Sequence, residues 1–351
     1  MIKENKKYIA IPPGATIKEQ LEYRNMRQKE FAARMGMSEK HISKLINGDT
    51  ALTPNVAKRL ESVLGIPSKF WLNLETIYKD KLEKIKFEDA MEKDIEVMKK
   101  LPYNEMAKNN WVNQCTSPED KVWELRKFFE VAELTNVTND KIAPKIACRR
   151  KNITEKSDYA LLAFAQKAKI EARNRTVSSL DISKLKSYVS EMRKLSTKDF
   201  SYYLQEIIDR FADCGVAVIF LPHIAGSYLH GATFCDKNKI VIGITARGKY
   251  TDKFWFSLCH EIGHIVLGHL ELEDITEAEE NEADKYASEL LIHPDELIEF
   301  IQKRSISKDS ILSFAEKICV DPGIIVGRLQ NDSYIEHSQY NDLKKQLEYF
   351  H

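Results

Sequence analysis

Residues 254–270 read FWFSLCHEIGHIVLGHL, an almost wholly apolar run that contains a His-Glu-x-x-His motif. The run predicts one buried helix from Phe254 to Leu270. Residues four apart lie above one another on a helix, so His260 and His264 would face the same way and could bind one cation. Glu261 lies beside them, where it would contact a metal-bound water. The stretch therefore predicts a zinc-hydrolase site.

A catalytic zinc ion needs three protein ligands and an open position, so a third ligand must come from elsewhere in the chain. Residues 277–287, EAEENEADKYA, predict a second helix, on which Glu280 and Asp284 share one face. We expect Glu280 to bind the metal. We expect Asp284 to accept the free N–H of a ligating imidazole.

Two other residues compete with Glu280 as the third ligand. Glu282 lies two residues further along and has the same carboxylate chemistry. Some zinc proteases use a third histidine after the motif, but that arrangement needs Gly and His where this chain has Leu267 and Leu270. His269 would also point away from the ligand face of the same helix, so we assign it to the helix end. A buried helix with two hydrogen-bonded histidines and no metal is the alternative to a metal site.

Two further segments accompany the motif and complete a resemblance to the ImmA/IrrE-type metallopeptidases. ENEADKYASELLIHP matches the family pattern E-x-x-A-N-x-F-A-x-x-L-L-x-P, and RGKYTDKFWF also resembles the family. The resemblance extends over roughly residues 182–330. The departures from the pattern remove no ligand; they are Asp284 for Asn, Tyr286 for Phe, and the additional His293 before Pro294.

The motif and the resemblance predict a zinc metallopeptidase of the HEXXH type, a gluzincin-like endopeptidase. We expect His260, His264 and Glu280 to hold Zn²⁺, and Mn²⁺ would also suit a His₂Glu site. Glu261 would accept a proton from the metal-bound water and deliver it to the leaving amine. A loop between two predicted strands offers three candidate oxyanion donors that spacing does not separate: His223, Tyr228 and His230.

Charge is distributed unevenly along the chain. The 351 residues contain 53 Lys+Arg and 53 Asp+Glu, a balance that argues against a protein dedicated to nucleic acid. Residues 1–84, however, carry 16 basic and 10 acidic residues, which predicts a basic module attached to an acidic one. Six scattered cysteines without a C-x-x-C, no signal peptide and no long apolar run predict a cytoplasmic protein without a membrane segment.

The basic module contains a helix-turn-helix pattern. Residues 27–50, RQKEFAARMGMSEKHISKLINGDT, read as helix, turn and helix, in which Gly36 supplies the turn and Ser38 caps the second helix. An earlier helix is expected to open at Thr16, which has capping-box spacing to Glu19. The apolar residues predicted to form a common core are Phe31, Ala32, Met35, Ile42, Leu45 and Ile46.

Residues 12–78 resemble the HigA-type antitoxin branch of the Xre-like repressors. The resemblance implies that the helix after Ser38 lies in the major groove of DNA and that the protein binds a palindromic operator as a homodimer. The residues expected to contact DNA are Gln28, Ser38, Glu39, Lys40, His41, Lys44 and Asn47. A helical hairpin kept only for protein contacts is the alternative.

These segments predict a mainly α fold with a small β-sheet, an α+β class. The expected domains are a five-helix helix-turn-helix domain (1–79), a helical connector (80–181), a zincin-like metallopeptidase domain (182–330) and a C-terminal tail (331–351). Two apolar, β-branched segments, GVAVIFLP and NKIVIGIT, predict strands of the sheet, with a loop over residues 223–237 between them.

Two functions fit this organisation. The first is a DNA-binding regulator whose metallopeptidase domain cleaves a regulatory protein, such as a repressor or antitoxin. The second is a HigA-like antitoxin or repressor whose peptidase-like domain senses a metal or a partner without proteolysis. Double-stranded operator DNA, a protein substrate and a toxin are the partners that these readings imply.

Overall fold

The computed structural model describes residues 2–5, 7–139, 146–147, 155–224, 230–245, 250–272, 275–302 and 306–347. The chain divides into two compact units, Met1–Ile95 and Glu96–His351. Helices make up most of the described regular structure, which confirms the expected mainly α class with a small sheet. Within the described residues, no helix is both long enough and apolar enough to cross a lipid bilayer.

The first unit is built from a short hairpin and a group of helices with a shared apolar core. Its elements are β1 (Lys3–Glu4), β2 (Ile9–Ala10), α1 (Pro13–Tyr23), α2 (Gln28–Met35), α3 (Glu39–Asn47), α4 (Pro54–Leu64) and the greater part of α5 (Ser68–Lys100). Phe31, Leu60 and Trp71 are fully buried in this core. α1 begins before the predicted Thr16, because Pro13 fits the first turn of a helix.

The predicted helix-turn-helix is present as α2 and α3. Gly36 ends α2 with a φ of 63°, in the left-handed region that favours glycine. The Ser38 side chain caps α3 by accepting a hydrogen bond of 3.2 Å from the His41 N–H. Gly14 allows α1 to approach α3 closely, because a Cβ there would lie 2.0 Å from the Ile46 carbonyl oxygen.

The second unit contains a small sheet and the remaining helices. Its strands are β3 (Ile146–Ala147), β4 (Val216–Leu221), β5 (Gly231–Asp236) and β6 (Lys239–Thr245). Its helices after α5 are α6 (Tyr103–Lys108), α7 (Pro118–Phe129), α8 (Glu155–Arg173), α9 (Ile182–Met192), α10 (Phe200–Ala212), α11 (Thr251–Val266), α12 (Glu277–Leu291), α13 (Pro294–Gln302), α14 (Lys308–Ile318) and α15 (Pro322–Asn331). The short 3₁₀ helices are η1 (Leu134–Thr138), η2 (Arg193–Thr197), η3 (His269–Glu271) and η4 (Asn341–Leu343).

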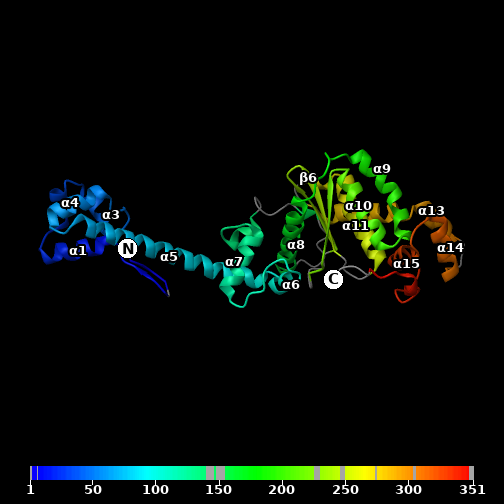
Figure 1. The fold of residues 1–351 in the computed structure, drawn as a ribbon, viewed down its shortest axis with the longest axis horizontal. Helices are drawn as coiled ribbons and strands as arrows, with labels where there is room; N and C mark the ends of the chain where they lie inside the picture. The colour runs from blue at the N-terminus through cyan, green and yellow to red at the C-terminus, as the bar shows by residue number, and fades with distance from the viewer. Residues whose placement is uncertain are drawn as a thin grey trace. The chain divides into compact units, whose positions relative to one another are not determined.

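The sheet lies between helices. Its strand order is β3-β5-β6-β4, with β4 parallel to β6 and the other neighbours antiparallel. α8 packs on one face, and α10 and α11 pack on the other (Figure 1). Gly243 of β6 faces α8, where a Cβ would lie 2.8 Å from the Phe164 ring, whereas Ile242 packs in the core beside α11. Both faces are covered, and this explains the nearly continuous apolar sequence of β6.

β5 corrects the predicted loop between the two apolar strands. The sequence assigned residues 223–237 to that loop, but Gly231–Asp236 form a strand that pairs antiparallel with β6. Glycine and a short length weaken the local strand signal of this segment. Its partner β6, which follows directly in sequence, supplies the backbone hydrogen bonds that hold it in the sheet.

The helix that carries the His-Glu-x-x-His motif is shorter at its C-terminus than predicted. α11 ends at Val266, so the expectation of one helix from Phe254 to Leu270 is wrong there. Gly268 has a φ of 79°, in the left-handed region, and the chain turns into η3 directly after it.

The segment after α15 returns to the first turn of α11. Lys344 Nζ lies 2.8 Å from Asp252 Oδ2, and both side chains are almost fully buried. The Thr251 N–H donates a hydrogen bond of 3.0 Å to the Lys345 carbonyl. The expected polar tail thus contacts the beginning of the motif helix at residues 344–346.

The predicted domain boundaries at residues 79/80 and 181/182 stay predictions. α5 runs through the first of them without a break, from Ser68 to Lys100. α8, which the sequence assigned to the connector, packs on β4 and β6. The layer that covers one face of the sheet therefore comes from outside the segment that resembles the metallopeptidases.

Candidate functional site

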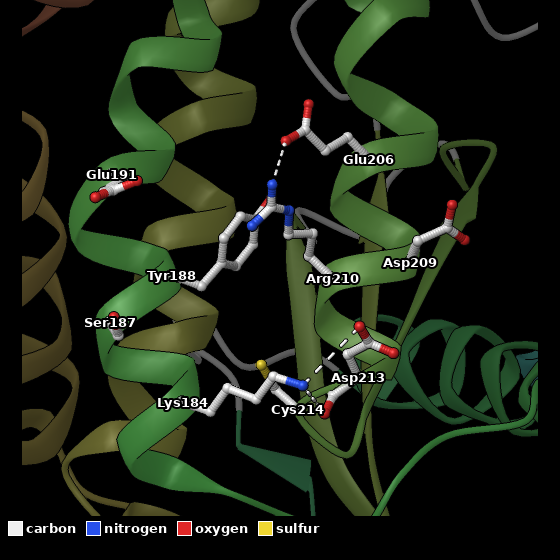
Figure 2. A pocket seen from close by; sticks show the side chains of 9 residues that line it. All are labelled: Lys184, Ser187, Tyr188, Glu191, Glu206, Asp209, Arg210, Asp213 and Cys214. Carbon is white, nitrogen blue, oxygen red and sulfur yellow. Dashed lines mark hydrogen bonds and ion pairs between the residues drawn. The ribbon is translucent and has the colours of Figure 1, made fainter.

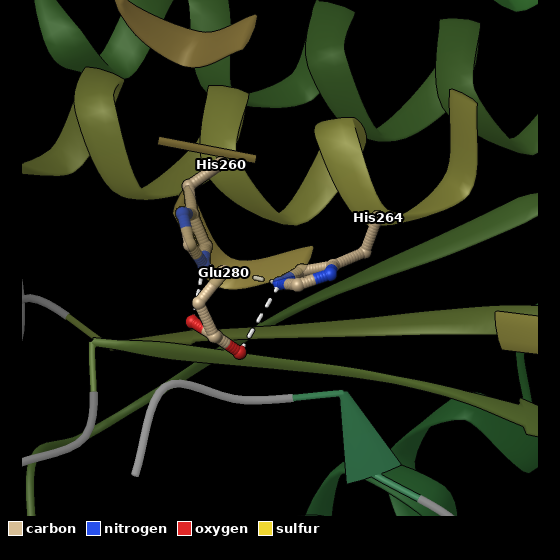
Figure 3. Close-up of side chains that lie close together, drawn as sticks. All are labelled: His260, His264 and Glu280. Atoms are coloured by element: carbon tan, nitrogen blue, oxygen red, sulfur yellow. Dashed lines mark hydrogen bonds and ion pairs between the residues drawn. The ribbon is translucent and has the colours of Figure 1, made fainter. Parts of the chain in front are cut away.

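Two histidines and one glutamate converge between α11 and α12. His260 and His264 lie on successive turns of α11, with their Nε2 atoms 3.1 Å apart. Glu280 of α12 places Oε2 3.4 Å from His260 Nε2 and Oε1 3.7 Å from His264 Nε2. Figure 3 shows the three side chains pointing toward one another. All three are buried, so the structure brings together the three residues predicted as metal ligands.

The spacing of these atoms fits a tetrahedral metal site. A zinc ion with ligand distances of about 2.0–2.2 Å holds neighbouring ligand atoms about 3.3–3.6 Å apart. The separations of 3.1, 3.4 and 3.7 Å lie close to that range. Both Glu280 carboxylate oxygens are buried and accept no hydrogen bond of normal geometry, which is costly for an ionised group. A divalent cation bound at this point would offset that cost.

The Asp284 carboxylate contacts His260 from the next turn of α12. Its Oδ1 lies 2.9 Å from His260 Nδ1, the position expected for a carboxylate that orients a ligating imidazole. Burial lowers the pKa of His260, but the neighbouring carboxylates of Asp284 and Glu280 outweigh burial and raise that pKa to about 10. Metal binding through His260 Nε2 would require that nitrogen to be free of its proton.

Glu261 lies on the adjacent side of α11, against the sheet. The Thr233 hydroxyl of β5 donates a hydrogen bond of 2.5 Å to Glu261 Oε2. Gly231 makes room for the carboxylate, because a Cβ there would lie 2.6 Å from Glu261 Oε1. Burial raises the pKa of Glu261 to about 7, although His260 and Thr233 act in the opposite direction. A carboxylate with a pKa near neutrality suits proton transfer.

His269 contacts His264, contrary to the prediction that it points away from the ligand face. Its Nδ1 lies 3.0 Å from His264 Nδ1, on the ring edge opposite the Nε2 atom that faces Glu280. Its Nε2 lies 3.4 Å from Glu282 Oε2. The prediction assumed an unbroken helix, but the chain turns at Gly268. Glu282, the rival third ligand, thus contacts His269, and Glu280 contacts the two motif histidines.

The helix-turn-helix presents polar side chains along α3. Among the predicted DNA contacts, the exposed residues are Gln28, Ser38, Glu39, Lys40, Lys44 and Asn47. His41 is half-buried, and its Nε2 is a buried atom without a hydrogen-bond partner. The Ser38 hydroxyl already serves as the helix cap. Lys40 and Lys44 lie four residues apart, so they project from the same side of α3.

Comparison with known proteins identifies both parts of the chain. A helix-turn-helix family model matches residues 17–71, and the uncharacterized HTH-type transcriptional regulator YddM of Escherichia coli (strain K12) is 38% identical over 66 residues, 19% of this chain and 70% of that protein. The chain belongs to the HTH-type transcriptional regulators. An IrrE N-terminal-like domain model of the M78 peptidase family matches residues 213–329, which include the converging histidines and glutamate. This regulator therefore also carries an IrrE-like domain.

A solved structure similar to the N-terminal part of the regulator is an addiction module antidote protein of a HigA family from Coxiella burnetii. It is 28% identical and covers 24% of this chain and 92% of its own, with a TM-score of 0.22.

The candidate oxyanion donors of the IrrE-like domain stay predictions. His223 is half-buried after β4, and His230 is exposed directly before Gly231, the residue that adjoins Glu261. Tyr228 lies outside the described residues. Thr233 was not considered from the sequence, because a threonine on an unrecognised strand gives no local signal of a contact with Glu261.

A cavity of about 680 Å³ lies between α9 and α10, apart from the converging ligands (Figure 2). Its floor includes the Tyr188 ring, over which the Arg210 guanidinium lies 5.3 Å from the ring centroid. Arg210 also lies 3.4 Å from Glu206, and Lys184 lies 3.9 Å from Asp213. The two cationic side chains of this cavity that lie near carboxylates are Arg210 and Lys184. None of the residues that line the cavity belongs to the candidate metal site.

Proposed function

We propose that this regulator binds operator DNA through α3 and hydrolyses a peptide bond in a regulatory protein at His260, His264 and Glu280 of its IrrE-like domain. The observation that carries the proposal is the convergence of three buried ligand atoms beside a buried Glu261. Two imidazoles and one carboxylate form the donor set of many zinc proteases. Zn²⁺ is the proposed ion, and Mn²⁺ also suits these donors.

Each side chain has a separate role in the proposed hydrolysis. When bound, the ion would supply a Lewis acid that polarises a peptide carbonyl and makes water easier to deprotonate. His260, His264 and Glu280 hold it and leave one position open. Glu261 takes the proton from the attacking water and later gives it to the leaving amine. Thr233 holds one Glu261 oxygen, so the carboxylate has a fixed orientation before the reaction begins.

The DNA-binding part supports a regulatory purpose for the cleavage. We propose that a homodimer binds a palindromic operator, with Gln28, Ser38, Glu39, Lys40, His41, Lys44 and Asn47 at the DNA interface. The similarity to an antidote protein suggests a toxin as a further partner. The substrate proposed for the IrrE-like domain is then a repressor or antitoxin protein.

The test of the metal site is the metal content of the purified full chain. Wild type should contain about one zinc ion per chain, as metal analysis measures it. Glu280→Gln should lose it, because the amide replaces a charged ligand. Glu282→Gln is the matched control: it makes the same chemical change two residues away and should retain the metal. Absence of metal in zinc-supplied wild type, or equal loss in both variants, would contradict the proposed ligands.

The test of proteolysis is a comparison of wild type with Glu261→Gln, which keeps the ligands and removes the base. Mass spectrometry of new protein N-termini in cells should detect a cleavage product with wild type that is missing with the variant. Transcription of the target operon should follow the same pattern. Normal regulation by a zinc-loaded Glu261→Gln protein would exclude proteolysis and would favour a domain that senses a metal or a partner.

A further inference from the structure

His269 and Glu282 continue the metal site away from the ion. His269 is buried, and its Nδ1 lies 3.0 Å from Nδ1 of His264. On its other side, His269 Nε2 lies 3.4 Å from Oε2 of Glu282, whose side chain is 67% exposed. His264 is itself fully buried, so the three residues form a row from the ligand to the protein surface.

The turn at the end of α11 creates this row. On a continuous helix, a residue five positions after His264 would be rotated about 140° from it. Gly268, with its left-handed backbone, directs the chain back and sets η3 against the ligand. A Cβ at Gly268 would meet nothing within 4 Å, so the glycine serves backbone conformation rather than space.

The hydrogen-bond roles in the row follow from metal binding. A neutral imidazole has one N–H and one lone pair. If His264 binds the ion through Nε2, its proton must be on Nδ1, and that N–H can only donate to Nδ1 of His269. His269 then carries its own proton on Nε2, where Glu282 accepts it. Each ring thereby fixes the tautomer of the next one.

We propose that His269 is a positioning residue for the metal centre: it accepts the Nδ1–H of His264 and thereby keeps His264 Nε2 free for the ion. The inference rests on the proposed metal site. It assigns the two ligand histidines different supports, a carboxylate of α12 (Asp284) for His260 and a second imidazole for His264. Outer partners of this kind typically contribute a factor of about 10–100 to metal affinity.

The experiment measures zinc affinity of the full chain by competition with a chelating indicator. His269→Leu fills similar space but accepts no hydrogen bond, and we expect about 10–100-fold weaker zinc binding. His269→Asn places an amide oxygen near the position of Nδ1 and should restore most of the affinity. Glu277→Gln is the control: it removes an exposed carboxylate from the first turn of the same helix α12, and its zinc affinity should stay near wild type.

Two further readouts separate positioning from packing. Thermal unfolding with excess chelator should give His269→Leu and His269→Asn similar melting temperatures, since both lack the metal contribution. The visible spectrum of the cobalt-substituted protein should change in His269→Leu and return toward wild type in His269→Asn. Equal zinc affinity in wild type and His269→Leu, or equal loss in both His269 variants, would overturn the proposal.

The measurements distinguish failure of the His269 proposal from failure of the proposed zinc-dependent proteolysis. A wild type that binds no zinc would overturn the metal centre and the row together. A wild type that binds zinc without cleaving any protein would remove the proteolytic proposal alone, because none of the measurements on the His269 variants depends on cleavage.

Discussion

Removal of Lys40 and Lys44 should reduce the salt dependence of DNA binding. Both side chains are exposed on one side of α3, where the proposal puts them near DNA phosphates. Each phosphate contact contributes about 0.9 to the slope of log affinity against log salt concentration. Lys40→Ala with Lys44→Ala removes four such contacts from a homodimer, so the slope should fall by about 3.6.

This slope change corresponds to a large difference in affinity across an ordinary salt range. Between about 50 and 200 mM salt, wild type should lose about 150-fold more affinity than the double variant. Fluorescence anisotropy with a labelled random-sequence duplex measures both slopes and requires no knowledge of the operator. The anisotropy change on binding also reports whether the variant still associates with DNA.

A matched control removes the same charge elsewhere in the first unit. Lys84 and Lys86 of α5 lie outside the helix-turn-helix match at residues 17–71. They pair with Asp80 and Glu83 at 2.8 and 2.6 Å. Lys84→Ala with Lys86→Ala should leave the slope nearly unchanged. An unchanged slope in the α3 variant, or the same reduction in both double variants, would refute the assignment of α3 to the DNA interface.

Three further predictions concern the candidate metal site. Zinc should raise the melting temperature of wild type, because an ion at 100 times its dissociation constant stabilises the folded state by about 2.7 kcal/mol, and Glu280→Gln should show no such rise. The raised pKa of Glu261, about 7 against an ordinary 4.5, means that the folded state binds this proton more tightly than the unfolded chain. The stability that this proton contributes is therefore present below pH 4.5 and is lost as the pH rises to 7. In urea unfolding without metal, the free energy of unfolding of Glu261→Gln should be about 3 kcal/mol higher than that of wild type at pH 8, and the two should be equal near pH 4. Thr233→Val should cost about 1.5–3 kcal/mol at pH 8, because it removes a hydrogen bond to an ionised group, whereas Thr233→Ser should retain most of the stability; equal losses would point to packing instead.

The parts of the site that depend on local spacing could be predicted from the sequence. Two histidines four apart on a helix must share a face, and this geometry led to His260 and His264 before any fold was known. The choice of Glu280 over Glu282 also followed from its spacing to Asp284. In the structure, Glu280 contacts both histidines and Asp284 contacts His260.

The contacts that depend on chain reversal or strand pairing could not be predicted in the same way. Thr233 reaches Glu261 because β5 pairs with β6 and the sheet packs on α11, and neither step leaves a pattern near Thr233 itself. His269 was misjudged because one glycine, Gly268, ends the helix early. The packing of α8 on the sheet joins segments far apart in sequence, which periodicity within either segment does not reveal.

The buried pair of Lys344 and Asp252 affects when the first turn of α11 can pack during synthesis of the protein. Asp252 leaves the ribosome about 90 residues before its partner does. At the usual rates of translation the carboxylate stays without Lys344 for about 5–20 s, and a buried charge without its partner is strongly destabilising. The first turn of α11 can therefore reach its final packing only after Lys344 has been synthesised.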